Sequence, residues 1–340
     1  MRWLGLDIGG ANIKAASTDG EVFSTSFQFW TERDRLEEVL TQAVKRFHCD
    51  SPLSIAATMT AELADCFETR QAGVEYVVDC LAKVCQSLEL AAPIFASTDL
   101  VFRDAGRAKA QWLKTAASNW ANLASFASRF LPQQSGIVFD LGSTTTDIIP
   151  VRSGEVLAQG KTDFQRLQNG ELVYVGARRT PVCSLVDALT IDGVRTPIAR
   201  EHFATIDDAM LLRGFVDEDE NDLDTADGRP RTAAHAAQRI SRMVCEDARD
   251  LGIENAILCS TEILGQVEAM LLTAIEAVEN TSGNPQSFVC TGSGVSFAKY
   301  LFNKHYPNAK LISLGLEIGH SIDIVAPAFA VAVLASEGKS

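Results

Sequence analysis

Residues 4–14 of this 340-residue chain read Leu-Gly-Leu-Asp-Ile-Gly-Gly-Ala-Asn-Ile-Lys, and residues 137–149 read Ile-Val-Phe-Asp-Leu-Gly-Ser-Thr-Thr-Thr-Asp-Ile-Ile. Each segment predicts an apolar strand, an Asp with one apolar residue after it, a turn rich in glycine or hydroxyl groups, and a second apolar strand. A glycine turn lets backbone N–H groups approach an anion closely, and the adjacent Asp suits a hydrated Mg²⁺. Two such turns facing each other would hold a phosphate chain from both sides.

The strand–turn–strand pattern starts twice, with a break at residues 131–136. Because strands alternate with helices, the chain is predicted to be an α/β protein with an internally duplicated topology. The expected strands lie within 2–17, 21–30, 53–60, 93–102, 137–149, 154–160 and 287–290, with a strand-rich span at 168–196. The expected helices are 35–47, 74–90, 106–130, 232–251, 261–279, a helix from Gly294 to about 306, and 326–336.

Composition narrows the class of protein. Hydrophobic residues make up 46% of the chain and the formal net charge is −14. The negative charge argues against nonspecific nucleic-acid binding and against an anionic membrane surface. We expect neither a signal peptide nor a transmembrane helix, and therefore a location in the cytoplasm. The glycine turns predict a small phosphorylated or pyrophosphorylated molecule as the partner. The oligomeric state stays open.

A third glycine motif, Thr291-Gly292-Ser293-Gly294, falls at an expected strand-to-helix junction. Backbone N–H groups and the helix dipole favour an anion or a nucleotide there. We therefore expect Gly292, Ser293 and Gly294 on the nucleotide or substrate side of the site.

The order of the three motifs resembles that in the sugar kinase, heat-shock-70 and actin superfamily. Residues 139–148 are similar to the Gly-Gly-Thr-Thr-Thr-Asp segment of the hydantoinase A/oxoprolinase family, with Ser143 in place of a glycine. The first turn departs from that family's Gly-Gly-Thr-Phe-Thr-Asp, because it reads Gly-Gly-Ala-Asn-Ile-Lys. The resemblance implies a two-domain actin/sugar-kinase-like fold (ribonuclease H-like and duplicated) with an interdomain cleft. The first domain would be 1–134 with a C-terminal helix at 321–340, and the second 135–320 with an inserted segment of about 160–230.

A narrower resemblance, to the tetrahydromethanopterin-linked one-carbon-transfer group of that family, rests on segments 6–16, 116–122, 139–151, 170–182, 201–208 and 227–232. It implies a transferase of methanofuran-type coenzyme biosynthesis. Such an enzyme joins a γ-glutamyltyramine-like phenol to an aminomethylfuran methyl pyrophosphate and releases pyrophosphate. The alternatives are an ATP-dependent kinase or oxoprolinase-type amidohydrolase, and a nucleotide-binding regulatory protein without turnover.

Residue roles follow from these patterns. Asp7 and Asp140 are expected to organise Mg²⁺, and Asp147 is either a further metal-side carboxylate or a cap of the turn. Lys14 is either a point charge on the phosphate or a solvated lysine at a strand end. ATP is a possible ligand. The expected phosphate-binding residues are Gly9, Gly10, Asn12, Lys14, Gly142, Ser143, Thr144 and Thr145.

A phenol needs a base, because its pKa is near ~10. Glu62 and Asp99 are the candidates, since Glu62 follows the apolar residues 54–60 and Asp99 follows residues 93–98, and open α/β sheets place ligands at the carboxyl ends of strands. The other interpretation of Glu62 is the first turn of a helix capped by Thr60. Asn119 is a further substrate-side candidate, whereas the adjacent Trp120 is expected in the core.

Paired arginines suit carboxylate or phosphate recognition in an acidic protein. Arg178 and Arg179 precede Thr180-Pro181, and Arg229 and Arg231 flank Pro230. The other interpretation is salt bridging to residues 217–227, which carry seven carboxylates and are expected to form a solvated loop.

Overall fold

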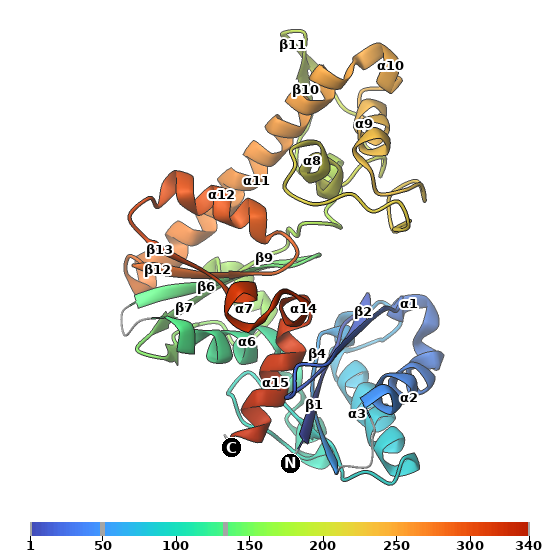
Figure 1. Cartoon of the computed structure of the whole chain (residues 1–340), viewed down its shortest axis with the longest axis vertical. Coiled ribbons are helices and arrows are strands. Elements are labelled where there is room, and N and C mark those ends of the chain that lie inside the picture. The colour runs from blue at the N-terminus through green and yellow to red at the C-terminus, as the bar shows by residue number, and fades with distance from the viewer. Residues whose placement is uncertain (1, 48–51, 132–134, 339–340) are drawn as a thin grey trace. The chain divides into compact units, whose positions relative to one another are not determined.

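The computed structural model describes residues 2–47, 52–131 and 135–338, and Figure 1 shows its ribbon. The chain divides into two compact units. The first comprises 1–138, 149–168 and 312–340, and the second comprises 139–148 and 169–311. Residues 132–134, in the expected break, lie outside the described residues. The domain bounds expected from the sequence stay a prediction.

The strands are β1 (Arg2–Ile8), β2 (Asn12–Ser17), β3 (Val22–Ser26), β4 (Leu53–Met59), β5 (Ile94–Phe95), β6 (Ser135–Leu141), β7 (Thr146–Arg152), β8 (Glu155–Val156), β9 (Leu172–Val173), β10 (Ala188–Ile191), β11 (Val194–Pro197), β12 (Ser287–Thr291) and β13 (Lys310–Ser313).

The α-helices are α1 (Phe29–Glu32), α2 (Leu36–Phe47), α3 (Arg70–Ser87), α4 (Ala105–Ala110), α5 (Trp112–Thr115), α6 (Asn119–Ala127), α7 (Asp163–Asn169), α8 (Ile206–Leu212), α9 (Ala233–Arg242), α10 (Ala248–Leu251), α11 (Ile253–Ser282), α12 (Val295–His305), α13 (Leu314–Ile318), α14 (His320–Asp323) and α15 (Ala326–Ser336). The 3-10 turns are η1 (Arg33–Arg35), η2 (Ala61–Leu63), η3 (Ser128–Phe130) and η4 (Val182–Ser184).

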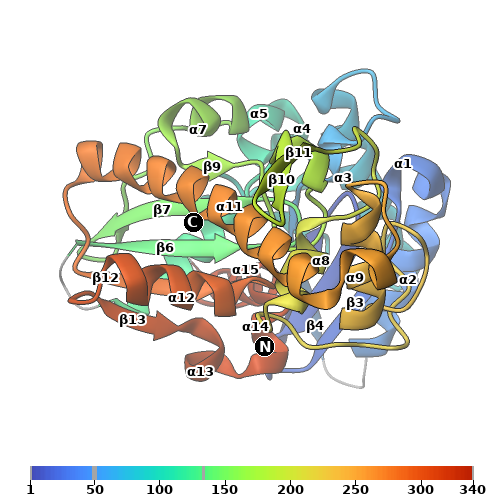
Figure 2. The ribbon, with the colours of Figure 1, turned by 90° about the horizontal axis from the view of Figure 1, so that it is seen from above.

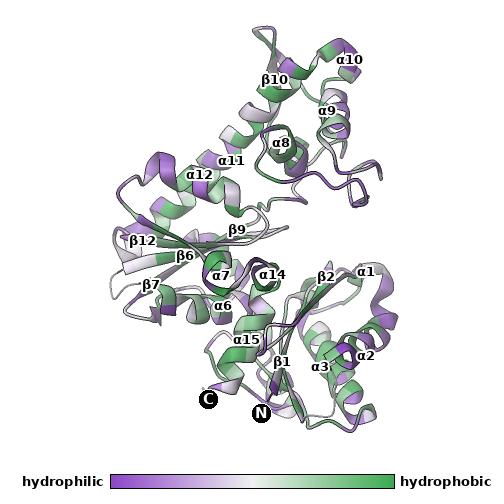
Figure 3. Ribbon diagram, in the orientation of Figure 1, coloured by the Kyte–Doolittle hydropathy of each residue, from purple (hydrophilic) through white to green (hydrophobic). Residues whose placement is uncertain are grey.

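The first sheet has the strand order β3-β2-β1-β4-β5. β1 pairs antiparallel with β2 and parallel with β4, so the strand that carries Asp7 lies between two neighbours. Residues Leu4 to Ile8 of β1 are buried, as expected for a central strand with both faces covered. On one face α15 lies against β1 so closely that a Cβ on Gly5 would overlap the carbonyl oxygen of Ala328. Figure 3 shows α15 as hydrophobic over most of its length.

The second sheet repeats this order. Its strands run β13-β12-β6-β7-β8, with β9 paired to β7. If β6, β7, β8, β12 and β13 stand for β1 to β5, the two orders are identical, so the predicted internal duplication is confirmed. Phe302 of α12 stacks on Phe288 of β12, with 3.9 Å between ring centroids, and meets Phe139 of β6 edge-on. This aromatic cluster holds α12 on the sheet, and Figure 2 shows α12 beside β12.

α11 is the longest described helix, with 30 residues. By length and composition alone it could cross a membrane, but the core helix of a globular protein passes the same test. Its buried residues, among them Cys259, Ile263 and Val267, follow helical spacing, and α11 packs against α8 and α9. The helix was predicted only from 261 to 279, because its first turns carry less apolar periodicity.

Several expected elements are shorter or broken in the structure. The strand at 93–102 is only β5, because residues 97–103 form a loop that Arg103 closes onto Asp99. The helical stretch at 106–130 is interrupted between α5 and α6, where Ala117 has a φ of +45°. The helix at 232–251 is likewise divided into α9 and α10, with Cys245 at a φ of +61°. β13 was not expected, since its pattern spans only four residues.

Candidate functional site

The twin turns close with the same hydrogen bond. The Gly9 N–H donates to the Asn12 carbonyl at 3.0 Å, and the Gly142 N–H donates to the Thr145 carbonyl at 2.9 Å. An Asp stands two residues before each of these glycines, at Asp7 and Asp140. The position five residues after each glycine holds Lys14 in the first turn and Asp147 in the second. The two turns therefore share a backbone but differ in charge at one equivalent position.

The first turn lies beside the carboxyl end of β4. The Thr60 N–H donates to the Ile8 carbonyl at 3.0 Å, and a Cβ on Gly9 would be 3.5 Å from the Thr60 hydroxyl. Asp7 is buried and pairs in register with Lys14 on one side and Thr58 on the other. A Cβ on Gly10 would meet nothing within 4 Å, so the turn is open on that side.

Glu62 lies two residues beyond Thr60, in η2, and is only 3% exposed. Among the described residues its Oε2 has no hydrogen-bond partner. Burial, with a smaller contribution from the nearby Asp163, raises the pKa of Glu62 from its ordinary 4.5 to about 8, although backbone hydrogen bonds from Glu62 and Ala117 oppose the rise. Thr60 is in the capping position but its side chain makes no cap hydrogen bond. Glu62 is thus a buried, mostly protonated carboxyl group at neutral pH.

The segment that faces Glu62 is held in an uncommon conformation. Ala117 has a φ of +45°, a left-handed value that few non-glycine residues adopt. The next residue, Ser118, is fixed by a 2.8 Å hydrogen bond to the Thr58 hydroxyl of β4 and a 3.2 Å bond to the Ala96 carbonyl. These bonds keep the Ala117 backbone beside the Glu62 carboxyl.

A buried arginine, Arg166, contacts Trp120, two residues after Ser118. The guanidinium carbon of Arg166 is 4.3 Å from the ring centroid of Trp120, and its Nη1 is 3.1 Å from Asp163 Oδ1. Trp120 is buried, as the sequence predicted, and carries this cation on its ring face. Asn119, the first residue of α6, is half-buried.

Asp99 is held differently from Glu62. Both guanidinium Nη atoms of Arg103 lie 2.8 Å from its two carboxylate oxygens, and Lys114 Nζ lies 2.9 Å away. Burial alone would raise the pKa of Asp99, but hydrogen bonds from Arg103, Ser97 and Lys114 hold it well below its usual range. A carboxylate so strongly stabilised is a weak base. Of the two candidate bases, Glu62 fits the role better.

In the second unit, three segments meet at the second turn. Gly294 N–H donates to the Leu141 carbonyl at 2.9 Å, and Ala177 N–H donates to the Gly142 carbonyl at 2.8 Å. A Cβ on Gly292, which has a φ of +91°, would overlap an Asp140 carboxylate oxygen, and a Cβ on Gly176 would overlap the backbone of Ser143 and Thr144. Only glycine permits these two approaches.

The arginines divide into two groups. The Arg178 and Arg179 N–H groups both donate to the Ser143 carbonyl, at 3.1 and 3.0 Å, so this pair borders the second turn. Arg231 instead pairs with the buried Asp207 at 2.6 Å. Arg229 donates to Gln238 at 3.0 Å. Ion pairs to residues 217–227 are made by Arg178, 2.8 Å from Asp222, and by Arg229, 3.9 Å from Asp227, whereas the ion-pair partner of Arg231 lies outside that loop.

The carboxylates near the second turn are the possible protein ligands for Mg²⁺. Among the described residues, no group of three or more His, Cys, Asp or Glu side chains gathers as a metal site. Mg²⁺ commonly uses one or two carboxylates together with waters and substrate phosphates. Gly292 packs on Asp140 so closely that a Cβ there would overlap its Oδ1. The Asp140 carboxylate at the second turn is the type of ligand that suits a hydrated Mg²⁺, whereas Asp147 is buried within β7.

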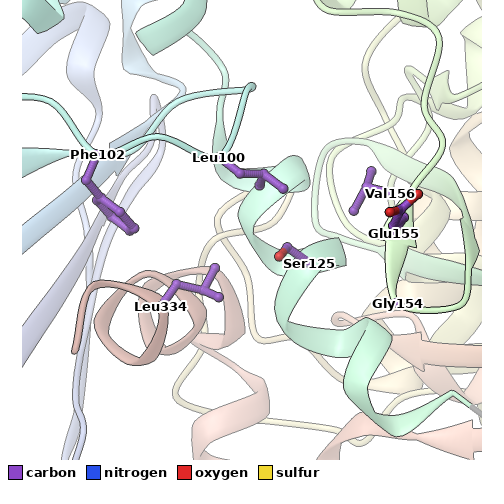
Figure 4. Close-up of a pocket in the computed structure, with 7 residues that line it drawn as sticks. All are labelled: Leu100, Phe102, Ser125, Gly154, Glu155, Val156 and Leu334. Carbon is purple, nitrogen blue, oxygen red and sulfur yellow. The ribbon is translucent and has the colours of Figure 1, made fainter. Parts of the chain in front are cut away.

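A cavity of about 420 Å³ in the first unit was not expected from the sequence. Figure 4 shows Leu100, Phe102, Val156 and Leu334 along its walls, with Ser125 and Glu155 as its polar groups. None of the predicted site residues lines it.

Sequence reasoning missed the residues that support the site. Gly73 of α3 lies against Glu62, because a Cβ there would be 2.7 Å from the Glu62 Cα. Asp163 and Gly176 were also not singled out as site residues. A glycine at the fourth position of a helix such as α3 is a weak signal of close approach, and nothing in the local sequence links Asp163 to Glu62.

Comparison with known proteins shows what the chain is similar to. A family model described as hydantoinase/oxoprolinase matches residues 54–334. The chain is 33% identical over 334 residues, 97% of its length, to (4-{4-[2-(γ-L-glutamylamino)ethyl]phenoxymethyl}furan-2-yl)methanamine synthase of Methanocaldococcus jannaschii, of which 96% is covered. A protein of the same name from Methanococcus vannielii is 31% identical over 200 residues, covering 58% of this chain and 89% of that protein.

A structural likeness supports the fold. A nucleotide-free structure of acetone carboxylase, studied for ATP-dependent acetone carboxylation, has a TM-score of 0.55 at 10% identity and covers 98% of this chain and 70% of that one. Together with the repeated strand order, it confirms the predicted α/β fold class with its duplicated topology.

Proposed function

Because this chain belongs to the hydantoinase/oxoprolinase family, we propose that it is a transferase of methanofuran-type coenzyme biosynthesis. It joins a γ-glutamyltyramine-like phenol to an aminomethylfuran methyl pyrophosphate, forms an aryl ether and releases pyrophosphate. The observation that carries the proposal is the 33% identity to the Methanocaldococcus jannaschii synthase across nearly the full length of both chains. We keep the cytoplasm as the proposed location and small molecules as the proposed partners.

The proposed ether formation requires a general base and a site that stabilises the leaving group. In the proposed reaction the phenol gives its proton to Glu62 in its ionised form, which is the minor form at neutral pH, and the phenolate oxygen forms a bond to the furfuryl carbon. The bond from that carbon to the pyrophosphate oxygen breaks, and its electron pair leaves with pyrophosphate. A base with a pKa of about 8 is better matched to a phenol than an ordinary carboxylate, because proton transfer then costs less free energy.

The leaving group is proposed to bind at the second turn. Backbone N–H groups at Ser143 and Thr144 in this turn suit phosphate oxygens. Gly142 contributes differently, because its own N–H group already closes the turn. Asp140 would hold Mg²⁺ at this turn, and the ion would neutralise charge developing on the leaving oxygens.

The test is a reconstitution with purified protein. The chain is incubated with the phenol, the furfuryl pyrophosphate and Mg²⁺, and we expect the aryl ether by mass spectrometry and one pyrophosphate per ether. ATP is supplied in a parallel reaction. ATP hydrolysis or phosphoryl transfer without ether formation would replace the proposal with the kinase or amidohydrolase alternative.

The role of Glu62 is tested by a matched pair of variants. Glu62→Gln is expected to lower the rate at least about 100-fold, as for loss of a general base. Glu68→Gln makes the same chemical change at an exposed residue six positions further on and is expected to retain the activity. Equal rates in the two variants would remove Glu62 from the mechanism without touching the overall reaction.

A further inference from the structure

We propose that Asp222 is an internal anion that occupies the ligand-binding position of Arg178, and that the Asp222 side chain is released from Arg178 when a pyrophosphate group takes its place at the second turn. The acidic loop is defined here as residues 217–227. This inference deepens the proposed function and rests on its assignment of pyrophosphate to the second turn.

The backbone places Arg178 at the second turn. Its N–H donates to the Ser143 carbonyl at 3.1 Å, and the preceding Ala177 N–H donates to the Gly142 carbonyl at 2.8 Å. Gly176 then approaches Ser143 and Thr144 so closely that no side chain fits between them. Residues 176–178 therefore form a wall of the turn, and the Arg178 side chain starts from that wall.

The guanidinium of Arg178 is held by the acidic loop. Its Nη2 lies 2.8 Å from Asp222 Oδ2 and 3.4 Å from the carbonyl oxygen of Asp224. The side chains of Arg178 and Asp222 are 28% and 20% exposed, so water and ligands can reach the pair. An arginine binds a phosphate through the same donors that it offers to a carboxylate. Asp222 and an incoming phosphate are thus competitors for one cation.

The ends of the acidic loop are attached more firmly than its centre. At its start, Arg231 donates to the Asp217 carbonyl and pairs with the buried Asp207. At its end, Asp227 lies 3.0 Å from the fully buried Arg239, which also binds Asp208. The centre is attached through its backbone as well, because the Arg231 N–H donates to the Asp222 carbonyl at 3.0 Å and the Asp219 N–H donates to the Arg231 carbonyl at 2.9 Å. The Arg178–Asp222 pair is a side-chain attachment of the centre. Exchange at this pair would free the Asp222 side chain and leave these backbone bonds and both ends in place.

The negative charge of the acidic loop favours release of Asp222 from Arg178 when an anion binds at the second turn. Seven of its eleven residues are Asp or Glu, so an anion at the second turn repels the loop while Arg178 attracts the anion. Binding and release are therefore coupled, and the loop lowers the affinity of the turn for small anions that cannot displace it.

The first experiment compares two isosteric variants of the full chain by calorimetry with pyrophosphate and Mg²⁺. Asp222→Asn removes the competitor, and we expect about two- to five-fold tighter binding, the range for loss of a partly exposed ion pair. Asp224→Asn removes an equal charge from the same loop, but only the carbonyl of Asp224 contacts Arg178. It is expected to change the affinity by less than Asp222→Asn does.

A third variant, Arg178→Gln, removes the cation for which Asp222 and pyrophosphate compete. It is expected to weaken pyrophosphate binding about tenfold, and in its background Asp222→Asn and Asp224→Asn should have equal effects. Hydrogen exchange supplies a second readout. Amides 218–226 of the natural chain should exchange faster with pyrophosphate bound, and those of Asp222→Asn should exchange faster already without it.

The outcomes separate the two proposals. If the natural chain binds pyrophosphate but Asp222→Asn and Asp224→Asn bind it equally well, or if pyrophosphate slows exchange at 218–226, the inference about Asp222 is overturned and the proposed function stands. If the natural chain does not bind pyrophosphate under conditions in which it forms the aryl ether, the second turn is not its site and the inference falls with that assignment.

Discussion

Replacing Gly73 by alanine adds one methyl group where α3 passes η2. The new Cβ would be 2.7 Å from the Glu62 Cα, 2.8 Å from the Glu62 carbonyl oxygen and 3.0 Å from the Glu62 Cβ. Real side chains do not come so close to a backbone atom, so α3 or η2 must move. Since η2 carries the proposed base, the movement displaces the Glu62 carboxyl.

The magnitude follows from two opposing effects. Overpacking of this kind costs about 1–3 kcal/mol, and alanine gains about 0.5–1 kcal/mol over glycine within a helix. The expected net result for Gly73→Ala is a loss of about 1–2 kcal/mol in the free energy of unfolding. The control is Gly265→Ala in α11, where a Cβ would meet nothing within 4 Å. That variant should gain about 0.5–1 kcal/mol, because only the helix propensity changes.

The assay is urea unfolding of both variants, followed by far-UV circular dichroism, with ether synthesis measured on the folded proteins. Gly73→Ala should lower the urea midpoint and reduce the turnover number, whereas Gly265→Ala should raise the midpoint and leave turnover unchanged. If Gly73→Ala is stabilised as much as Gly265→Ala, the tight approach of α3 to η2 is wrong, and the positioning of Glu62 by α3 falls with it.

Three further predictions concern pH, the second turn and a buried ion pair. Glu62 binds its proton more tightly in the folded chain (pKa about 8) than in the unfolded one (4.5), so its contribution to stability is complete below pH 4.5 and is lost as the pH rises to about 8. Glu62→Gln should therefore reduce the pH dependence of the melting temperature across this range. An unchanged pH dependence would contradict the burial of the Glu62 carboxyl. Gly176→Ala should weaken pyrophosphate binding at least about tenfold by displacing Ser143 and Thr144, whereas retained affinity would show that the turn tolerates the shift. Arg239→Met should cost about 3–5 kcal/mol, because Asp208 is left buried without its cation; a loss below about 1 kcal/mol in chemical denaturation would mean that water reaches the pair.

Much of the fold could be predicted because its signals are local. An apolar run, an Asp and a glycine turn specify each hairpin within about a dozen residues, and the repeat of that pattern gave the duplication. Gly292 and Gly294 were expected only on the nucleotide or substrate side of the site, and their contact with the second turn through Asp140 and Leu141 was not predicted.

What could not be predicted depends on distant residues. The surroundings of Glu62 come from Thr58, Gly73, Ala117 and Asp163, which are joined only by the pairing of strands and the packing of helices. Asp99 had the same sequence position relative to its strand as Glu62, yet Arg103 and Lys114 give it the opposite electrostatic environment. Strand-end position alone therefore does not distinguish a base from a salt-bridge partner.

The shared hydrogen bond of the twin turns has a consequence for how this chain can vary. Gly9 and Gly142 keep the same backbone closure, while the equivalent positions Lys14 and Asp147 have taken opposite charges. The two turns therefore have the same main-chain hydrogen bond but side chains of different charge. Exchanging the two turn segments would therefore keep each hairpin but reverse the charge at positions 14 and 147, so the two segments cannot replace each other.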